Sequence, residues 1–209
     1  MRTSILIPAL ISIVLAGCGD RTPPAPVAPE SDTSAKTDAP APPAAASAQA
    51  PGADVGMLPA ADTITFAGFG PAAFGTDEEG VRMAWGKELE GAPGEPGGCY
   101  VLVPAPRGQP PFRFGFVLEG DKFARIDVRT DAISAPGGGK LGMSADEIVR
   151  LYPGAQTMPH KYVEGARTLR AKDPAGGNAA LVFETDAKGI VVAWRIGVPP
   201  QIDYVEGCG

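Results

Sequence analysis

The chain has 209 residues, with 18 lysines and arginines against 24 aspartates and glutamates and a formal net charge of −6. This acidic balance, without a cluster of basic residues, argues against nucleic acid as a partner. Residues 61–209 have the size of one ordinary domain or of two small repeats. They contain a single histidine and two cysteines, so histidine- and thiol-based catalysis has few residues to draw on.

The N-terminal segment has a pattern typical of secretion. Arg2 precedes an apolar stretch, residues 5–15, and small residues follow it up to Cys18. A positive start, a short apolar stretch and a small-residue cleavage point are typical of a signal peptide, and the stretch is too short to span a bilayer. Residues 15–18, Leu-Ala-Gly-Cys, resemble the lipobox of bacterial lipoproteins. An ordinary signal peptide with a chance cysteine is the alternative.

The lipobox resemblance implies a signal peptide of residues 1–17, cleavage before Cys18, and acylation of both the Cys18 sulfur and the new N-terminus. Several acyl chains give stable membrane anchoring without a transmembrane helix, and no later segment is apolar enough to supply one. In Gram-negative lipoproteins an Asp directly after the cysteine usually retains the protein at the inner membrane, whereas here Gly19 holds that place. We therefore expect a lipoprotein of the bacterial outer membrane whose body faces the periplasm or the cell surface.

Residues 18–60 form a linker of a different composition. After Cys18 they are rich in Pro, Ala, Ser, Thr and Asp, and they contain no large aromatic residue. Such a segment cannot bury enough apolar surface to offset the entropy cost of ordering, so we expect a disordered tether. Where the tether is polyproline-like it extends by ~3.1 Å per residue, so roughly 40 residues reach at most about 120 Å from the membrane.

The first expected helix of the body starts after a glycine turn. Asp77 can accept hydrogen bonds from its first turn, Thr76 with Glu79 offers a second register for the cap, and Gly86 ends it. The following Gly- and Pro-rich segment, residues 91–98, predicts a loop. Three strands are expected after this loop, with a turn at residues 119–122: residues 99–103, 112–118 and 123–128.

A second expected helix follows the same pattern. Ser144 with Glu147 forms a capping box, apolar residues recur at helical spacing, and Pro153 with Gly154 ends the helix. Both helices are too short to stand alone, so they must pack on strands. Three strands are expected here too, with a hairpin turn at residues 186–189: residues 168–170, 180–185 and 190–196.

The two halves of the body correspond at an offset of 67 residues, which aligns Gly75 with Gly142 and Asp77 with Ser144. A fixed internal offset indicates tandem repeats, here residues 61–130 and 131–209. Glycine turns before capped helices are also common enough for the match to be a coincidence. Antiparallel strands with helices on one face predict an α+β fold, organised as two repeats.

Residues 141–147, a Gly-Met-Ser turn into a short helix, precede antiparallel strands in a pattern that resembles small bacterial envelope lipoproteins. Examples are the small lipoprotein subunit of the outer-membrane barrel-assembly machine and the tandem-repeat β-lactamase-inhibitor proteins. The resemblance implies binding to other proteins or lipids without a catalytic centre. The chain departs from those folds at residues 91–98, a loop where they usually carry a second helix. Residues 204–208, with residues 160–162, are similar to uncharacterised bacterial lipoproteins filed as lectins.

Cys99 and Cys208 are the two cysteines of the body. In an oxidising compartment two such thiols most simply pair. The bond would close a loop of roughly 110 residues, worth on the order of 4 kcal/mol in the chain-entropy model. Two free thiols or a pair of ligands are the alternatives.

No catalytic set or metal site is evident in the body. Ser144 is accounted for as a helix cap, and a thiol enzyme would need His160 beside a free cysteine. No acidic run has the spacing of a calcium loop, so we expect no enzyme activity, no metal and no cofactor. Four carboxylates that could otherwise serve a glycosidase are expected to be solvated: Glu184, Asp186, Asp203 and Glu206.

Recognition is the role that remains. Aromatic and polar residues of the second half suit a protein interface or stacking on a sugar: His160, Lys161, Tyr162, Trp194, Arg195 and Tyr204. Residues 160–162 are expected to be exposed because they follow a Pro-Gly break, whereas for Trp194 a core position on its strand is favoured over a role in binding. The leading hypothesis is an outer-membrane-anchored, non-enzymatic binding module for an envelope protein. A carbohydrate-binding, lectin-like lipoprotein is the first alternative, and an envelope hydrolase with His160 as its base is the second.

Overall fold

The computed structural model describes residues 59–60, 62–108 and 113–208. The chain divides into residues 1–48 and residues 49–209, and all described residues belong to the second unit. The predicted signal peptide, the predicted lipidation site Cys18 and nearly all of the predicted linker therefore lie outside the described residues. Within the described part, no helix is both long and apolar enough to cross a membrane.

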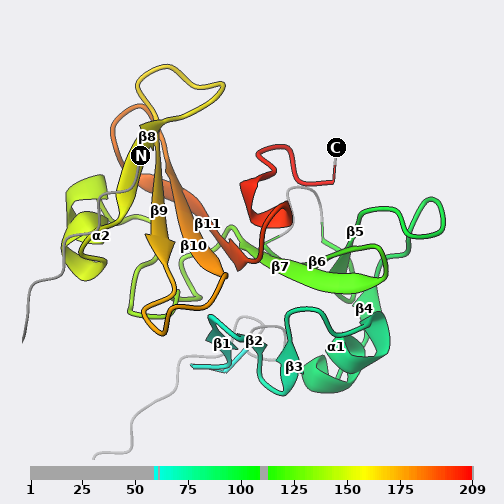
Figure 1. The fold of residues 1–209 in the computed structure, drawn as a ribbon. Helices are drawn as coiled ribbons and strands as arrows, with labels where there is room; N and C mark the ends of the chain where they lie inside the picture. The colour runs from blue at the N-terminus through cyan, green and yellow to red at the C-terminus, as the bar shows by residue number, and fades with distance from the viewer. Residues whose placement is uncertain (1–58, 61, 109–112, 209) are drawn as a thin grey trace, which may run out of the picture. The chain divides into compact units, whose positions relative to one another are not determined.

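An antiparallel sheet of eight strands forms the centre of the described body (Figure 1). The strand order across the sheet is β4-β5-β6-β7-β11-β10-β9-β8, so the last strand of each half of the chain lies at the middle, paired with the other. The strands are β4 (Leu89–Glu90), β5 (Tyr100–Pro104), β6 (Phe114–Glu119), β7 (Lys122–Val128), β8 (Gln156–Pro159), β9 (Arg167–Lys172), β10 (Ala180–Thr185) and β11 (Val191–Gly197).

Two helices end where their sequence signals predict. Helix α1 (Glu78–Trp85) is capped by Asp77, whose side chain accepts from the Gly80 N–H, and it ends at Gly86 in the left-handed conformation (φ 72°). Helix α2 (Ala145–Leu151) carries both hydrogen bonds of the Ser144 capping box. The structure thus selects Asp77 over Thr76 as the first cap.

A small second sheet precedes α1. It consists of β1 (Ile64–Thr65), β2 (Gly68–Phe69) and β3 (Ala72–Ala73), paired antiparallel in that order. Gly68 adopts a φ of +145°, and a Cβ atom there would lie 2.2 Å from the Ala72 carbonyl oxygen, so the close pairing of β2 with β3 requires glycine at this position. None of these two-residue strands carries a usable alternation pattern, and the sequence did not predict them.

The helices and the small sheet cover one face of the large sheet, which we call the helix face. Val81 of α1, Ile148 of α2 and Phe69 of β2 belong to one apolar cluster with the inward residues of the large sheet. Aromatic rings gather at its centre, where Phe116 contacts Phe69 edge-to-face at 4.9 Å between ring centroids. Burial of this apolar face provides the main driving force for folding.

The C-terminal segment covers part of the other face. Residues 198–208, which we call the tail, include the 3-10 helix η1 (Gln201–Asp203), and η1 contacts β7 and β11. In Figure 1 the tail, in red, lies above β6 and β7, whereas α1 and β1–β3 lie below them. Ile202 packs with Ala180 and Val182 in a separate small apolar cluster. All six residues of β10 are buried, because both faces of this strand are covered.

The α+β class agrees with the expectation, but each half has four strands of the large sheet rather than the three predicted. The additional strands are the two edge strands, β4 and β8. β4 is only two residues long, and the residues of β8 are polar or exposed and include Pro159. Short, exposed and proline-containing strands are typical of sheet edges and lack the alternation that predicts a strand.

Candidate functional site at the C-terminal tail

The tail is tied covalently to the start of β5. Cys208 forms a disulfide with Cys99, across 109 residues of sequence and with 5.2 Å between the two Cα atoms. The pairing predicted from the cysteine count is therefore present, and both thiols are consumed. A Cys–His pair built on either cysteine and His160 has no free thiol to act as nucleophile.

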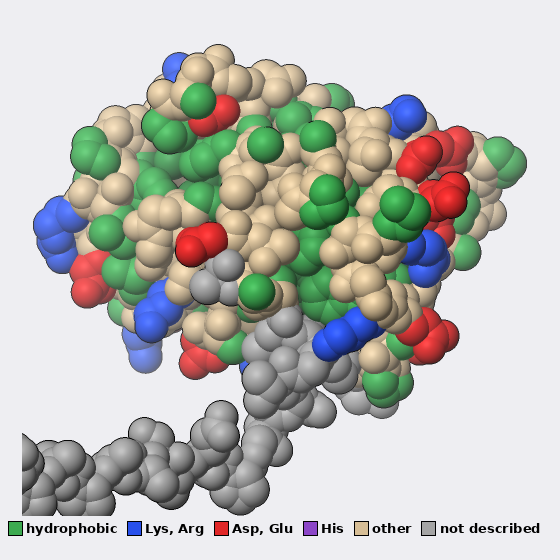
Figure 2. Space-filling model, turned by 90° about the horizontal axis from the view of Figure 1, so that it is seen from below, with side chains coloured by type: hydrophobic (Ala, Val, Ile, Leu, Met, Phe, Trp, Pro, Cys, Tyr) green, Lys and Arg blue, Asp and Glu red, His purple; other side chains and the backbone are tan. Residues whose placement is uncertain are grey.

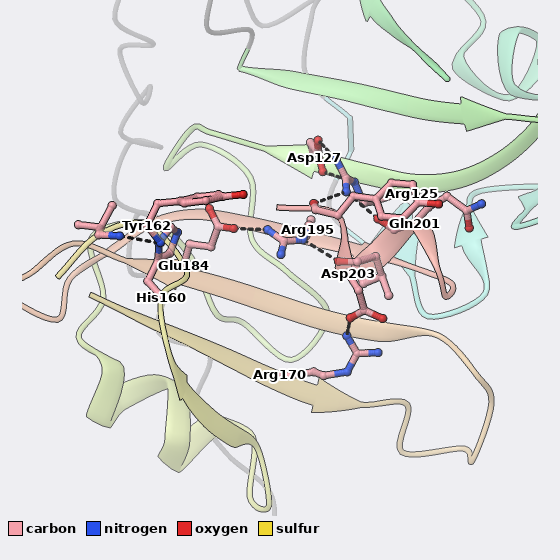
Figure 3. A network of polar contacts seen from close by, with 12 residues as sticks. Arg125, Asp127, His160, Tyr162, Arg170, Glu184, Arg195, Gln201 and Asp203 are labelled. Atoms are coloured by element: carbon pink, nitrogen blue, oxygen red, sulfur yellow. Dashed lines mark hydrogen bonds and ion pairs between the residues drawn. The ribbon is translucent and has the colours of Figure 1, made fainter. Parts of the chain in front are cut away.

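Arg125 of β7 holds the tail from the sheet side (Figure 3). Its side chain is 2% exposed, and Nη1 donates to the carbonyl oxygens of Gln201 at 2.7 Å and Tyr204 at 2.9 Å. Nη2 donates to Asp127 Oδ2 at 2.9 Å, and Nε lies 2.8 Å from Asp127 Oδ1. A guanidinium that bridges a carboxylate and two tail carbonyls fixes the path of the tail over the strand.

Arg195 of β11, the strand next to β7, also holds the tail. Its Nε donates to the carbonyl oxygen of Ile202 at 2.8 Å, and its Nη1 donates to Glu184 of β10. Arg195 lies directly opposite Asp127 in the β7–β11 register, so charges of both signs alternate beneath the tail. Breaking one partner of a buried pair costs about 3–5 kcal/mol, although the intact pair adds little net stability. We infer that these pairs position the tail more than they stabilise the fold.

The loop between β8 and β9 meets the tail on its outer side. Tyr162 donates its hydroxyl hydrogen bond to Glu206, and Lys161 Nζ lies 4.0 Å from Glu206 Oε1 and 4.7 Å from the centroid of the Tyr162 ring. His160 Nδ1 accepts the backbone N–H groups of Tyr162 and Val163, both at 3.2 Å. The hydrogen bond to Tyr162 raises the pKa of Lys161, so this residue stays cationic. His160 is thereby committed to shaping the loop.

Four of the six predicted binding residues come together around the tail: Lys161, Tyr162, Arg195 and Tyr204. Trp194 does not, because neighbouring residues of a strand point to opposite faces. Its side chain is 1% exposed in the cluster of the helix face, with Nε1 3.4 Å from the Ile133 carbonyl oxygen. Its ring is therefore not presented at the surface.

Sequence reasoning missed the buried charges of the site. Arg125 and Asp127 were not singled out as tail contacts, and Glu184 was expected to be solvated, whereas it is 9% exposed and paired with Arg195. The signal was available, because each of these residues interrupts an otherwise apolar strand. A charge in the middle of such a strand is almost never buried without a partner, so it predicts an ion pair or a covering segment.

Two pockets flank the tail. One, of about 210 Å³, lies between the tail and the middle of the sheet and is lined by Arg125, Asp127, Glu184 and Tyr204 among others. The second, of about 160 Å³, is lined by polar and apolar residues of β8, β9, β10, β11 and the tail. Both are smaller than the ≈ 300–1,000 Å³ of typical small-molecule sites. Each pocket suits a single side chain or functional group.

The surface away from these pockets carries mixed charge. On the face shown in Figure 2, Lys and Arg side chains alternate with Asp and Glu, and hydrophobic side chains are exposed between them. In the described residues, no group of three or more His, Cys, Asp or Glu side chains could hold a metal ion. The arrangement at the tail offers hydrogen-bond donors, charges and an aromatic edge, which are means of binding.

A second polar cluster lies at the N-terminal half, beside α1. Arg82 Nε donates to Glu78 Oε1 and Arg82 Nη1 to the Leu89 carbonyl oxygen, and the Tyr100 hydroxyl donates to Glu78 Oε2, all at 2.6 Å. Burial, and then the Glu78 carboxylate, raise the pKa of Tyr100. Burial opposes ionisation of Glu78, but Tyr100 and Arg82 outweigh it and lower the pKa of Glu78. The cluster fastens α1 to the β4–β5 edge.

No family model matches the sequence, and no curated protein matches it. In structure, the chain is similar to an extracellular protein containing an SCP domain from Bacillus anthracis str. Ames, with a TM-score of 0.38 and 11% sequence identity. The similarity covers 60% of this chain and 44% of that chain, which is less than half of its length. At this TM-score it carries no argument about function.

Proposed function

We propose that the chain is a lipid-anchored, non-enzymatic binding module of the bacterial outer membrane, which recognises another envelope protein through the tail and the β8–β9 loop. The lipobox-like residues 15–18 support the location. The observation that carries the binding role is the preorganised tail, which a disulfide and two buried arginines hold in one place. Preorganisation lowers the entropy cost of association, so a surface held in this way is suited to recognition.

The side chains around the tail favour a protein as partner. Met158, Tyr162 and Val163 expose 44%, 54% and 47% of their surface within six residues of sequence, next to Lys161. Tyr, Met and Arg are enriched at protein interfaces, where one anchor side chain often fills a small pocket. The pocket of about 160 Å³ beside this loop matches such an anchor in size.

We further infer that the body consists of two copies of one unit, residues 61–130 and 131–209. Constant spacing supports this: Asp77 and Ser144 cap the two helices 67 positions apart. Register shifts in the two central hairpins, after residues 117 and 184, have the same spacing. The Gly75 N–H donates to a β7 carbonyl and the Gly142 N–H to a β11 carbonyl. Only the second copy carries the tail and only the first carries the small sheet β1–β3, so these are elements that the two copies do not share.

The partner is tested by photo-crosslinking in living cells. With a photoreactive phenylalanine analogue in place of Tyr162, we expect a covalent adduct to an envelope protein. The matched control places the analogue at Met83 of α1, which is 74% exposed and far along the chain from the tail. An adduct at Met83 but none at Tyr162 would overturn the proposed binding surface.

The anchor is tested separately. The variant Cys18→Ser should appear in the soluble periplasmic or culture fraction, whereas the parent chain should sediment with outer membranes. Equal sedimentation of both would show that Cys18 does not hold the chain on the membrane.

A carbohydrate is the second candidate partner. The exposed Tyr162 ring beside Lys161 favours it, because aromatic faces flanked by polar groups stack on sugars. Glycan-array binding that is abolished by Tyr162→Ala, in the absence of any protein adduct, would select this candidate.

A further inference from the structure

We propose that the smaller pocket beside the tail binds a carboxylate of the protein partner, an acidic side chain with an apolar neighbour. This inference deepens the proposed function and rests on it. The pocket is lined by three cationic residues and one anionic residue, namely Lys161, Arg170, Arg195 and Asp203. Arg195 and Lys161 also face carboxylates of the chain outside this lining, Glu184 and Glu206, so Arg170, whose partner Asp203 is exposed, is the cation that we assign to the ligand.

The carboxylate of Asp203 occupies the position on Arg170 that we assign to a carboxylate of the partner. Arg170 Nη1 binds Asp203 Oδ1, and the Arg170 side chain is 20% exposed whereas that of Asp203 is 56% exposed. Because the Asp203 carboxylate is mostly exposed, water screens this pair, and the pair is worth much less than a fully buried one. A partner carboxylate can therefore replace Asp203 on the arginine at small cost, and Asp203 can turn into solvent.

The other two cations of the lining lie in the same pocket as Arg170, each next to a carboxylate of the chain. The buried Arg195 has Nε and Nη1 fixed by the Ile202 carbonyl oxygen and Glu184, so its guanidinium cannot leave the pocket wall. Lys161 also lines the pocket, beside Tyr162 and Glu206. A planar guanidinium together with a mobile ammonium is a combination that suits a carboxylate.

The apolar residues of the pocket indicate which kind of ligand would bear the carboxylate. Met158, Pro159, Val182 and Val205 line the same pocket, and its volume is about 160 Å³. This space is too small for a drug-sized ligand, which needs ≈ 300 Å³ or more. An aspartate or glutamate side chain with one apolar neighbour satisfies both the charge and the walls.

The test titrates the full chain, labelled with ¹⁵N and purified from envelopes in mild detergent, with acetyl-Leu-Glu-Leu-amide. The control peptide is acetyl-Leu-Gln-Leu-amide, which has the same shape without the charge. We expect the side-chain NMR signals of Arg170 and Arg195 to move with the Glu peptide at millimolar concentration and to stay fixed with the Gln peptide. Equal shifts with both peptides, or none with either, would overturn the carboxylate site.

Substitutions in the pocket should weaken or strengthen binding of the Glu peptide in a predictable direction. Arg170→Gln should weaken binding of the Glu peptide about tenfold, as expected for a charged hydrogen bond. Asp203→Asn should tighten it severalfold, because it removes the competing carboxylate. Lys140→Gln changes charge equally at an exposed position outside the pocket and should have no effect. Weaker binding in Asp203→Asn would contradict the exchange of one carboxylate for another.

The outcomes separate this inference from the proposed function. Crosslinking of a protein at Tyr162 that persists unchanged in Arg170→Gln would retain the binding module and discard the carboxylate site. N-acetylmuramic acid, a sugar that carries a carboxylate, serves as a third probe. If it binds and the Glu peptide does not, the ligand is a glycan and the proposal of a protein partner is overturned.

Discussion

The two faces of the large sheet are built from alternate residues of the same strands, yet they are held together differently. Phe183 and Trp194 point into the apolar cluster of the helix face, while their neighbours Glu184 and Arg195 form a buried ion pair beneath the tail. The helix face depends on non-directional apolar burial, which tolerates exchange of similar side chains. The tail face depends on directed contacts, which specify one position. The difference teaches that stability and the placement of the proposed binding surface depend on opposite faces of the sheet.

The helix face should give the largest loss of stability. Phe183 is fully buried, so Phe183→Ala should lower the free energy of unfolding by about 3–5 kcal/mol, measured by urea denaturation. Val192 lies on the same hairpin but is 48% exposed, and Val192→Ala should stay within about 0.5 kcal/mol. A cost at Phe183 no larger than at Val192 would show that the apolar cluster is not what stabilises the body.

On the tail face, removal of one charge of the Arg125–Asp127 pair should lower stability more than removal of both. Asp127→Leu leaves Arg125 buried without its counter-charge and should cost about 3–5 kcal/mol. Replacing both, as Arg125→Leu with Asp127→Leu, should recover most of that loss, while hydrogen exchange at the amides of residues 201–204 accelerates. A double variant as unstable as the single one, with a protected tail, would mean that the pair stabilises the fold rather than placing the tail.

The disulfide should affect both the free energy of unfolding and the hydrogen-exchange protection of the tail. Cys99→Ser with Cys208→Ser removes a link across 109 residues and should cost about 2–4 kcal/mol in thermal or urea unfolding. The tail amides should then exchange faster than those of β10, which keeps its cover on the helix face. If hydrogen exchange accelerates equally at all amides, the disulfide stabilises the whole body, and the proposed difference between the two faces of the sheet is wrong.

The smallest effect concerns pH at the α1 edge. Folding lowers the pKa of Glu78, so its ionised form favours the folded state. This contribution is present above the ordinary glutamate pKa of 4.5 and is lost as the pH falls through the lowered pKa. Between pH 5 and 3, the stability of Glu78→Gln should therefore fall less steeply than that of the parent chain. Tyr100→Phe removes a hydrogen bond that lowers this pKa and should flatten the profile in the same direction; an unchanged slope in both variants would contradict the assignment.

Local signals predicted much of the fold. The Ser144 capping box, the stop at Gly86 and the hairpin turn at residues 186–189 are each decided within a few residues, and the structure has all three. The long loop at residues 91–98 is present as well. The edge strands and the small sheet were missed because two-residue or polar strands owe their pairing to neighbours rather than to their own pattern.

The site was predictable only in part, for a related reason. Lys161 and Tyr162 were found because they lie together in one loop. Arg125 meets the tail through partners 76 and 79 positions away, a distance over which no local pattern operates. Trp194 was kept as a binding candidate although a core position was favoured for it, because its strand was known but not which face of that strand the helices cover.

The disulfide also has a mechanical consequence. It closes the chain between Cys99 and Cys208 into a covalent ring that contains β5 to β11 and the tail. A pulling force applied between residue 59 and Cys208 is carried by residues 59–99 and then by the sulfur–sulfur bond. The small sheet, α1 and β4 bear this load, whereas the strands beneath the proposed binding surface lie inside the ring and carry none of it along the backbone. A tension that enters the body at residue 59 therefore reaches α1 and β4 before it reaches those strands.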